Sequence, residues 1–233
     1  MQYFFSSNIS GNKILLSKEE SRHCALVLRY KEGDLVNVID GKGGLYTAEI
    51  TQLKNIVELE IIDKVQQKKG GFYIHIVIAP TKSSQRLEWF VEKAVEIGVD
   101  EISFMSCQNS ERKRINLNRI KKVVLAAMKQ SVKTYEPKIN DVEKFSDIIT
   151  KVVQENKYIG HLGNHSGEFL KDLIVANETY CLLIGPEGDF SNSELDTAIK
   201  NKFIPVLLGQ NRLRTETAGI VGCAILNGIN DNE

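Results

Sequence analysis

The spacing of apolar residues changes at one polar, glycine-ended segment of the chain, residues 64–71 (KVQQKKGG). Before this segment, three runs between residues 35 and 61 alternate apolar with polar side chains, which is the period of half-buried strands. After it, short apolar runs alternate with stretches whose apolar residues recur at helical spacing. We therefore predict a small β-rich domain over residues 1–69 and an α/β domain over residues 70–233.

The second region predicts strands and helices in alternation. The expected strands are residues 72–79, 102–105, 180–184 and 203–208. The expected helices include residues 87–95, residues 117–128, one that starts at the capping box Ser191–Glu194, and one that starts at Thr215. This order favours a largely parallel sheet, whose ligands bind at the carboxyl ends of the strands.

Basic residues are concentrated in one part of a chain whose formal net charge is zero. Residues 110–138 contain nine lysines and arginines and only two acidic residues. Such a segment is typical of a surface that binds a polyanion such as RNA. A solvated helix surface gives the same pattern, so charge alone leaves both interpretations open.

Cysteine usage and hydropathy indicate a cytoplasmic protein. The four cysteines lie far apart and form no CxxC pair, which favours reduced, buried thiols over disulfides or a metal site. No apolar run is long enough to span a bilayer, and residues 1–10 have neither the basic nor the apolar part of a signal peptide. His161 and His165 have no cysteine or carboxylate at ligand spacing, so we expect no metal.

Two loops between a strand and a helix contain the residues that bear chemistry. The first, residues 184–191 (IGPEGDFS), contains glycines that allow close approach of a ligand, although a tight turn would also explain them. The second, residues 208–218 (LGQNRLRTETA), contains Thr215 and Glu216, which suit a helix N-terminus. That structural role leaves Arg212 and Arg214 unexplained.

These loops resemble those of the SPOUT-class RNA methyltransferases, and most closely the RsmE family, which forms N3-methyluridine in 16S ribosomal RNA. The resemblance covers nearly the whole chain. The motifs that carry it, in chain order, are Arg22-His23 with Val27-Leu28-Arg29, Lys93 to Val99, Ser110-Glu111-Arg112, Gln130-Ser131, Pro137-Lys138-Ile139 and the two loops. The chain departs from the family pattern at Asp189, where a second glycine is usual, and at Asn211-Arg212, where Arg-Ile is usual.

The resemblance implies a PUA-like β-barrel domain followed by a SPOUT domain whose backbone forms a deep trefoil knot. It also implies a homodimer, to which the small residues Gly219 and Gly222 of the last helix are predicted to contribute. S-adenosylmethionine is the expected cofactor. The residues expected to hold it are Leu162, Gly163, Gly185, Glu187, Gly188, Leu208, Gly209 and Leu213, with the loop through Asn164 as a further wall.

The same resemblance assigns roles in the reaction. N3 of uracil carries a proton and lies on the Watson–Crick edge, so the base must be unpaired and deprotonated. Arg214 is expected to stabilise the negative charge on the uracil oxygens, and Glu216 is expected to accept the proton, ahead of Glu187. Phosphate contacts are expected from Arg22, His23, Arg29, Arg112, Lys113 and Arg114. Tyr30 could stack on a base or be half-buried packing.

Three other functions are possible for a chain with this sequence. A 2′-O-ribose RNA methyltransferase of the same superfamily is disfavoured by the motif at residues 22–29. A non-catalytic RNA-binding protein of ribosome assembly is disfavoured by the two intact loops. A dinucleotide-binding reductase is the weakest alternative, because no GxGxxG sequence follows the strand at residues 72–79.

Overall fold

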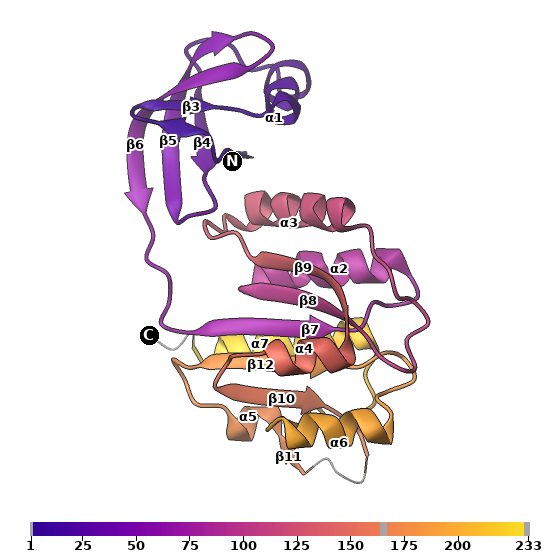
Figure 1. Ribbon diagram of the computed structural model, residues 1–233. Helices are drawn as coiled ribbons and strands as arrows, with labels where there is room; N and C mark the ends of the chain where they lie inside the picture. Colours follow the sequence, from indigo (N-terminus) through magenta and orange to yellow (C-terminus); the bar gives the residue numbers. More distant parts are fainter. Residues whose placement is uncertain (1, 164–166, 231–233) are drawn as a thin grey trace. The chain divides into compact units, whose positions relative to one another are not determined.

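The computed structural model describes residues 2–163 and 167–230, and the chain forms two compact units (Figure 1). The first unit consists of residues 1–69 together with residues 125–136, and the second consists of the remainder. The segment 125–136 joins the first unit because residues 134–136 pair with the loop after β4: Gly43 N donates to Thr134 O (3.0 Å) and Glu136 N donates to Gly41 O (3.0 Å). The domain boundary predicted from the sequence, at residues 69–70, assigns this segment to the second domain.

The first unit is built on a curled sheet of six strands (Figure 1). In spatial order its strands are β1 (Tyr3–Phe5), β4 (Leu35–Ile39), β5 (Gly44–Leu53), β6 (Val57–Gln66), β3 (Lys13–Leu15) and β2 (Ile9–Ser10). Alternate side chains of β4, β5 and β6 point to a core that includes Phe4, Val38, Ala48 and Leu59. The period-two runs of the sequence therefore form the expected strands.

Two short helical segments carry the first motif of the sequence. Helix α1 (Lys18–Arg22) begins at Ser17, whose side chain accepts a hydrogen bond from Glu20 N (3.1 Å), and continues as a π-helix, η1 (His23–Val27). Arg29 follows with a φ of 57°, in the left-handed region that few residues other than glycine adopt. A π-turn and a left-handed residue next to each other are features that recur at functional sites.

The second unit is an α/β domain with a seven-stranded parallel sheet. In spatial order its strands are β11 (Glu168–Phe169), β13 (Ile204–Leu207), β10 (Asn156–Gly160), β12 (Thr179–Ile184), β7 (Tyr73–Ile78), β8 (Glu101–Ser106) and β9 (Lys138–Lys144). The central strands β12 and β7 are buried over nearly their whole length, as expected for strands covered on both faces. The parallel sheet predicted from the sequence is confirmed.

Helices cover both faces of this sheet (Figure 1). The helices of the second unit are α2 (Ser84–Ile97), α3 (Leu117–Ser131, which ends in the first unit), α4 (Phe145–Lys151), α5 (Leu170–Leu173), α6 (Asn192–Lys200) and α7 (Thr215–Gly228). Helices α4 and α6 pack on Val77 and Leu183, whereas α2 and α7 pack on the opposite face, over Ile78 and Leu182. Helix α6 starts at the capping box that the sequence predicts, with Ser191 and Glu194 satisfying each other's backbone N–H.

The small residues of α7 serve packing within the chain. A Cβ at Gly219 would lie 2.5 Å from the Phe90 ring, and a Cβ at Gly222 would lie 2.2 Å from Leu182. Both glycines are therefore buried between α7, α2 and the sheet. The prediction that they contribute to a dimer surface is wrong, because their small size is needed inside the molecule.

All four cysteines are buried, free thiols, as the sequence predicts. Burial raises the pKa of Cys24 to about 11, so at neutral pH this thiol is protonated and a poor nucleophile. Within the described part of the chain, no helix is long and apolar enough to cross a membrane.

A buried polar cluster lies near the amino ends of β7, β8 and β9. His75 Nε2 lies 2.7 Å from Ser103 Oγ, and His75 Nδ1 lies 3.5 Å from Gln154 Oε1. Glu101 accepts hydrogen bonds from Tyr73 (2.8 Å) and from Lys138 (2.8 Å). Burial lowers the pKa of His75 below its ordinary value of 6.5, which keeps the imidazole neutral in the folded protein.

This cluster predicts a loss of stability in mild acid. Because the pKa of His75 is lower in the folded state than in the unfolded one, the unfolded chain takes up a proton first as the pH falls below about 6.5. We expect the free energy of unfolding to fall between pH 7 and 5 by up to about 1.4 kcal/mol per pH unit from this residue. Urea unfolding at both pH values measures it. An equal pH dependence in the non-titrating variant His75→Gln would contradict the assignment.

Candidate active site

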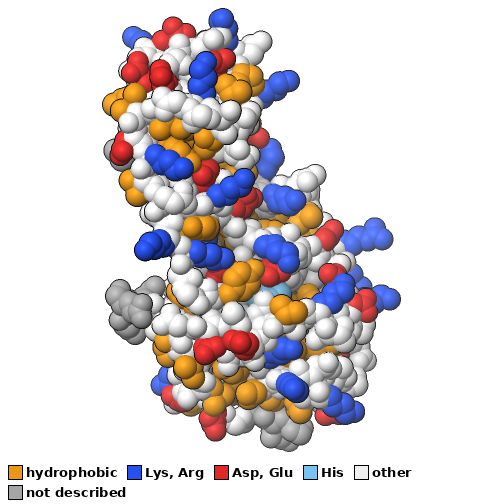
Figure 2. Space-filling model, turned by 60° about the vertical axis from the view of Figure 1, so that its left-hand side comes forward, with side chains coloured by type: hydrophobic (Ala, Val, Ile, Leu, Met, Phe, Trp, Pro, Cys, Tyr) orange, Lys and Arg blue, Asp and Glu red, His pale blue; other side chains and the backbone are white. Residues whose placement is uncertain are grey.

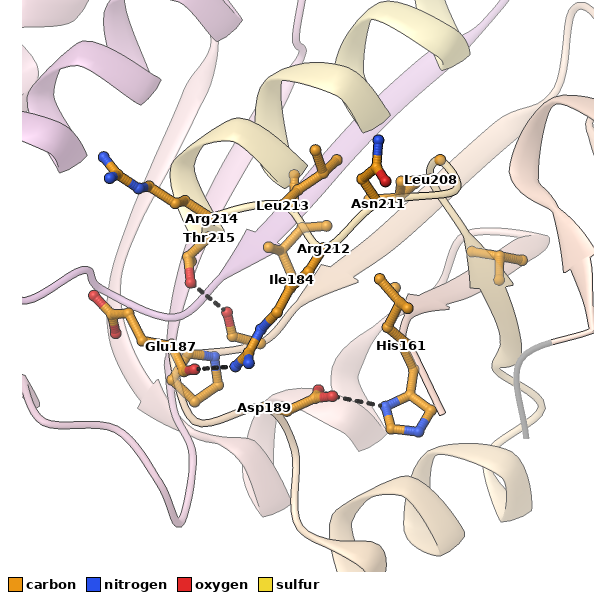
Figure 3. A pocket seen from close by; sticks show the side chains of 17 residues that line it. His161, Ile184, Glu187, Asp189, Leu208, Asn211, Arg212, Leu213, Arg214 and Thr215 are labelled. Carbon is orange, nitrogen blue, oxygen red and sulfur yellow. Dashed lines mark hydrogen bonds and ion pairs between the residues drawn. The ribbon is translucent and has the colours of Figure 1, made fainter. Parts of the chain in front are cut away.

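Three loops meet at the carboxyl ends of three adjacent strands, β13, β10 and β12, in the second unit (Figure 3). They are residues 161–163 after β10, residues 185–190 after β12 and residues 208–214 after β13. Together they enclose a cavity of about 600 Å³, within the usual range for a site that holds a small molecule. This is the place at which parallel sheets bind their ligands.

The loop 185–190 is held by contacts from the segments around it. Thr215 Oγ1, at the start of α7, donates to Gly185 O (3.1 Å), and Arg212 Nη2 donates to Glu187 O (3.2 Å). The Glu187 carboxylate accepts from Lys82 N (3.0 Å), and Asn109 Nδ2 donates to Gly188 O (3.2 Å). The backbone of this loop is therefore fixed before any ligand binds.

Asp189 adopts a φ of 61°, in the left-handed region that favours glycine. This conformation explains why a glycine is usual at this position in the family that the sequence resembles. Aspartate tolerates the region better than most residues because its short side chain bonds to nearby backbone, and here Asp189 Oδ1 accepts from Phe190 N (2.8 Å). The substitution thus leaves the loop conformation possible.

The loop 208–214 contributes two arginines to the lining of the cavity, and they differ in their contacts. Arg212 points toward the backbone of Glu187 (Figure 3) and is tied to it. Arg214 is exposed and immediately precedes α7, and within the described part of the chain its guanidinium makes no hydrogen bond or ion pair. Asn211 also lines the cavity. Arg214 is therefore the cation available to an incoming group.

The structure brings most of the residues expected to hold the cofactor around this one cavity. Those that line it are Leu162, Gly185, Glu187, Leu208, Gly209 and Leu213. Gly163 and Gly188 support the walls instead: a Cβ at Gly163 would lie 2.4 Å from His161 Nε2, and a Cβ at Gly188 would lie 3.1 Å from Asn109 Cβ. Asn164 lies outside the described residues.

Glu216 does not line the cavity, in contrast to Arg214. Its side chain is buried in the first turn of α7, and its Oε1 lies 3.6 Å from Nε of Arg86 on α2. Sequence reasoning did not single out Arg86, because nothing in the spacing of residues indicates that α2 passes beside the start of α7.

The residues expected to contact RNA form two groups, one on each unit. On the first unit, Arg22 and Arg29 are exposed on either side of η1, whereas His23 packs its ring against Phe4 with centroids 6.3 Å apart. Tyr30 also packs against Phe4, at 6.2 Å, so it is half-buried packing in this structure.

On the second unit, Arg112, Lys113 and Arg114 line a second hollow together with Lys82 and Glu111. Among the described residues these three cations form no ion pair, whereas Lys82 Nζ pairs with Glu111 (2.9 Å). Lys82 is thus a further basic residue of this surface that sequence reasoning missed, since it lies about thirty residues before the triplet.

The rest of the basic segment belongs largely to a solvated, paired helix surface. Arg119 pairs with Glu88 (2.9 Å), and Lys129 pairs with Glu20 (2.5 Å). On the face that Figure 2 shows, basic and acidic side chains are intermixed. Both interpretations of residues 110–138 stay open: in the part of the chain that the structure describes, Arg112, Lys113 and Arg114 form no ion pair, whereas Arg119 and Lys129 of α3 do.

No group of three or more histidine, cysteine or carboxylate side chains that could hold a metal occurs within the described residues. His161 instead pairs with Asp189, with Nδ1 3.1 Å from Oδ2 (Figure 3). His165 lies outside the described part of the chain.

Comparisons with known proteins agree with this arrangement. A family model described as an RNA methyltransferase domain matches residues 68–227, and one described as an RNA methyltransferase PUA domain matches residues 16–62. The ribosomal RNA small subunit methyltransferase E of Aquifex aeolicus is 29% identical, over 97% of this chain and 99% of that protein.

Solved structures share the whole architecture. The crystal structure of a probable rRNA-methyltransferase from Porphyromonas gingivalis has a TM-score of 0.89 and 36% identity, and the match covers 98% of each chain. The ribosomal RNA small subunit methyltransferase E of Neisseria gonorrhoeae, bound to S-adenosyl methionine, has a TM-score of 0.88 and 25% identity over 99% of this chain and 98% of that one. With both family domains in sequence and this fold around the cavity, the chain belongs to the RNA methyltransferase family of the ribosomal RNA small subunit methyltransferase E proteins.

Proposed function

We propose that this protein transfers the methyl group of S-adenosylmethionine to N3 of a uridine in 16S ribosomal RNA. The observation that carries the proposal is the cavity at the ends of β10, β12 and β13, because it combines a fixed backbone wall with an arginine, Arg214, that has no partner among the described residues. The choice of N3 of uridine rests on the resemblance of the motifs in the sequence to the RsmE family.

The residues around the cavity fit the proposed cofactor. Glycines at residues 185 and 209 bring the backbone close to the cavity, and Ile184, Leu208 and Leu213 supply an apolar lining for an adenine ring. When bound, S-adenosylmethionine supplies a methyl group on a positively charged sulfur, which is a strong electrophile and needs no metal. The work left to the protein is to align the acceptor atom and to stabilise the charge that develops on it.

Arg214 is the proposed charge-stabilising residue. Loss of the N3 proton places negative charge on the uracil oxygens, and the Arg214 guanidinium, which lines the cavity and has no other partner among the described residues, is the donor proposed for it. The proton acceptor proposed from the sequence is Glu216. To accept the proton, the Glu216 carboxylate has to leave Arg86 and contact the base. If it stays on Arg86, Glu216 serves to hold the start of α7 against α2. Glu187, which lines the cavity, is then the candidate for the proton acceptor.

The RNA is proposed to contact both units. Arg112, Lys113 and Arg114 would bind phosphates beside the active site, and Arg22, His23 and Arg29 would bind phosphates on the PUA-like unit. A deep trefoil knot, a homodimer, a place in the cytoplasm and action on the small ribosomal subunit are proposed on the resemblance alone. A ribose 2′-O-methyltransferase and a non-catalytic assembly protein remain the alternative functions.

The proposal is tested on RNA from a strain that lacks the gene. We expect one uridine of 16S ribosomal RNA to lose its N3 methyl group, and the purified protein with S-adenosylmethionine to restore it in the presence of EDTA. Nucleoside analysis by mass spectrometry separates N3-methyluridine from a 2′-O-methylated product. Full methylation in the deletion strain, or restoration only after a divalent metal is added, would contradict the proposal.

A further inference from the structure

His161 and Asp189 form a polar bridge between two loops of the active site that the proposed transfer chemistry does not use. His161 follows β10 directly, and Asp189 lies in the loop after β12, the strand that pairs with β10. Asp189 Oδ2 and His161 Nδ1 are 3.1 Å apart, a charge contact in which the imidazole is not aligned for a hydrogen bond, and both residues line the cavity (Figure 3). The bridge therefore spans the part of the cavity opposite Arg214.

Asp189 is fixed in the orientation that the bridge requires. Its backbone is held in the left-handed conformation, its carbonyl accepts from Asn109 Nδ2 (3.1 Å), and its Oδ1 accepts from Phe190 N (2.8 Å). These contacts leave Oδ2 directed at His161. The backbone of Asp189 is thus fixed by its conformation and by Asn109, and its side chain is fixed by one contact, at Oδ1.

His161 in turn determines where the next residues lie. Its side chain is largely buried at 13% exposure, and its backbone N donates to Val206 O (3.2 Å). Its ring lies against Gly163: a Cβ added to Gly163 would lie 2.4 Å from Nε2 of His161. Leu162, between them, is half exposed and lines the cavity. A turn of the imidazole would therefore displace the wall formed by residues 161–163.

We propose that Asp189 is a positioning residue for the cofactor: by pairing with His161 it holds residues 161–163 in place as a wall of the S-adenosylmethionine site. This inference rests on the proposed function and deepens it. The pair sets cofactor affinity, because a wall that is ordered beforehand removes the ordering penalty of binding. Among the described residues, the other charged side chains that line the cavity, Glu187, Arg212 and Arg214, form no hydrogen bond or ion pair with the two residues and do not replace the contact.

The test compares variants by calorimetric titration with S-adenosylmethionine and by steady-state kinetics. Asp189→Gly suits the left-handed backbone but removes the bridge, so we expect its Kd and KM for the cofactor to rise about tenfold while kcat stays within about twofold. His161→Phe keeps a ring against Gly163 without Nδ1 and is expected to show the same shift. Because the two residues act as one unit, the double variant should bind no more weakly than Asp189→Gly alone. Asp189→Asn, which retains an acceptor, should restore part of the affinity.

The outcomes separate this inference from the proposed function. Failure of the wild-type protein to bind S-adenosylmethionine would overturn the proposed function itself. Binding by the wild type with an unchanged Kd in Asp189→Gly would overturn only the inference. So would additive losses in the double variant, or a fall in kcat at unchanged Kd. Thermal melting of each variant identifies any loss caused by misfolding, and Asp189→Asn still tests the bridge if Asp189→Gly is unstable.

Discussion

Arg214→Ala should lower the rate of methyl transfer by about 100-fold or more while leaving the affinity for S-adenosylmethionine nearly unchanged. One preorganised donor that stabilises developing charge typically contributes that much to kcat. Arg214 lines the cavity and makes no side-chain contact within the described residues, so its removal does not loosen the loops that hold the cofactor. Single-turnover kinetics at saturating cofactor and RNA measure the rate, and calorimetry measures the affinity.

Arg212→Ala is the matched control for this experiment. Arg212 lies two residues away in the same loop, but its guanidinium donates to Glu187 O and so fixes the cofactor loop. We expect this variant to weaken cofactor binding more than it slows transfer. If Arg214→Ala instead lost RNA affinity and kept its single-turnover rate, Arg214 would belong to the RNA-binding surface.

Replacing Arg112, Lys113 and Arg114 together by alanine should weaken RNA binding at least tenfold at low salt and flatten its salt dependence. Each phosphate contact contributes about 0.7 to 0.9 to the slope of log K against log salt, so three contacts predict a loss of about 2 to 3. The three cations are unpaired among the described residues, so their removal leaves no buried partner behind. RNA titrations between about 50 and 200 mM salt measure the slope.

A variant with the same loss of charge elsewhere provides the control. Lys54, Lys144 and Lys200 are exposed, and within the described residues none forms an ion pair. Their joint replacement by alanine should change the slope far less, because they lie outside the second hollow. Equal losses in the two triple variants would show that the protein binds RNA through its overall charge, without a defined surface.

The sequence was sufficient to predict the elements that local chemistry determines. The period of two identified β4 to β6, and the serine–glutamate pair at residues 191–194 identified the start of α6 to the residue. The strands β9, β10 and β11 and the helices α4 and α5 were not predicted. Their segments are short or carry polar residues, and pairing with distant strands stabilises them.

The sequence predicted which loops form the candidate site, but not the contacts between their side chains. The order of strands and helices placed residues 184–191 and 208–218 at strand ends, and the structure brings these loops together. The partners of individual side chains depend on contacts across the fold. Arg86 beside Glu216 and His161 beside Asp189 join segments separated by many residues, and the burial of Gly219 against Phe90 reversed the role expected for that glycine.

The assignment of residues 125–136 to the first unit has a consequence for the order in which the chain can fold during synthesis. The loop at residues 41–43 gains its partners at residues 134–136 only after the first three strand and helix elements of the second unit, β7, α2 and β8, have been made. The backbone also passes between the units three times, at residues 69–70, 124–125 and 136–137. A single protease cut after residue 69 would therefore leave residues 1–69 attached through their noncovalent contacts with residues 125–136, which stay covalently joined to the second unit. The ribosome cannot release the first unit as a finished domain before it has begun the second.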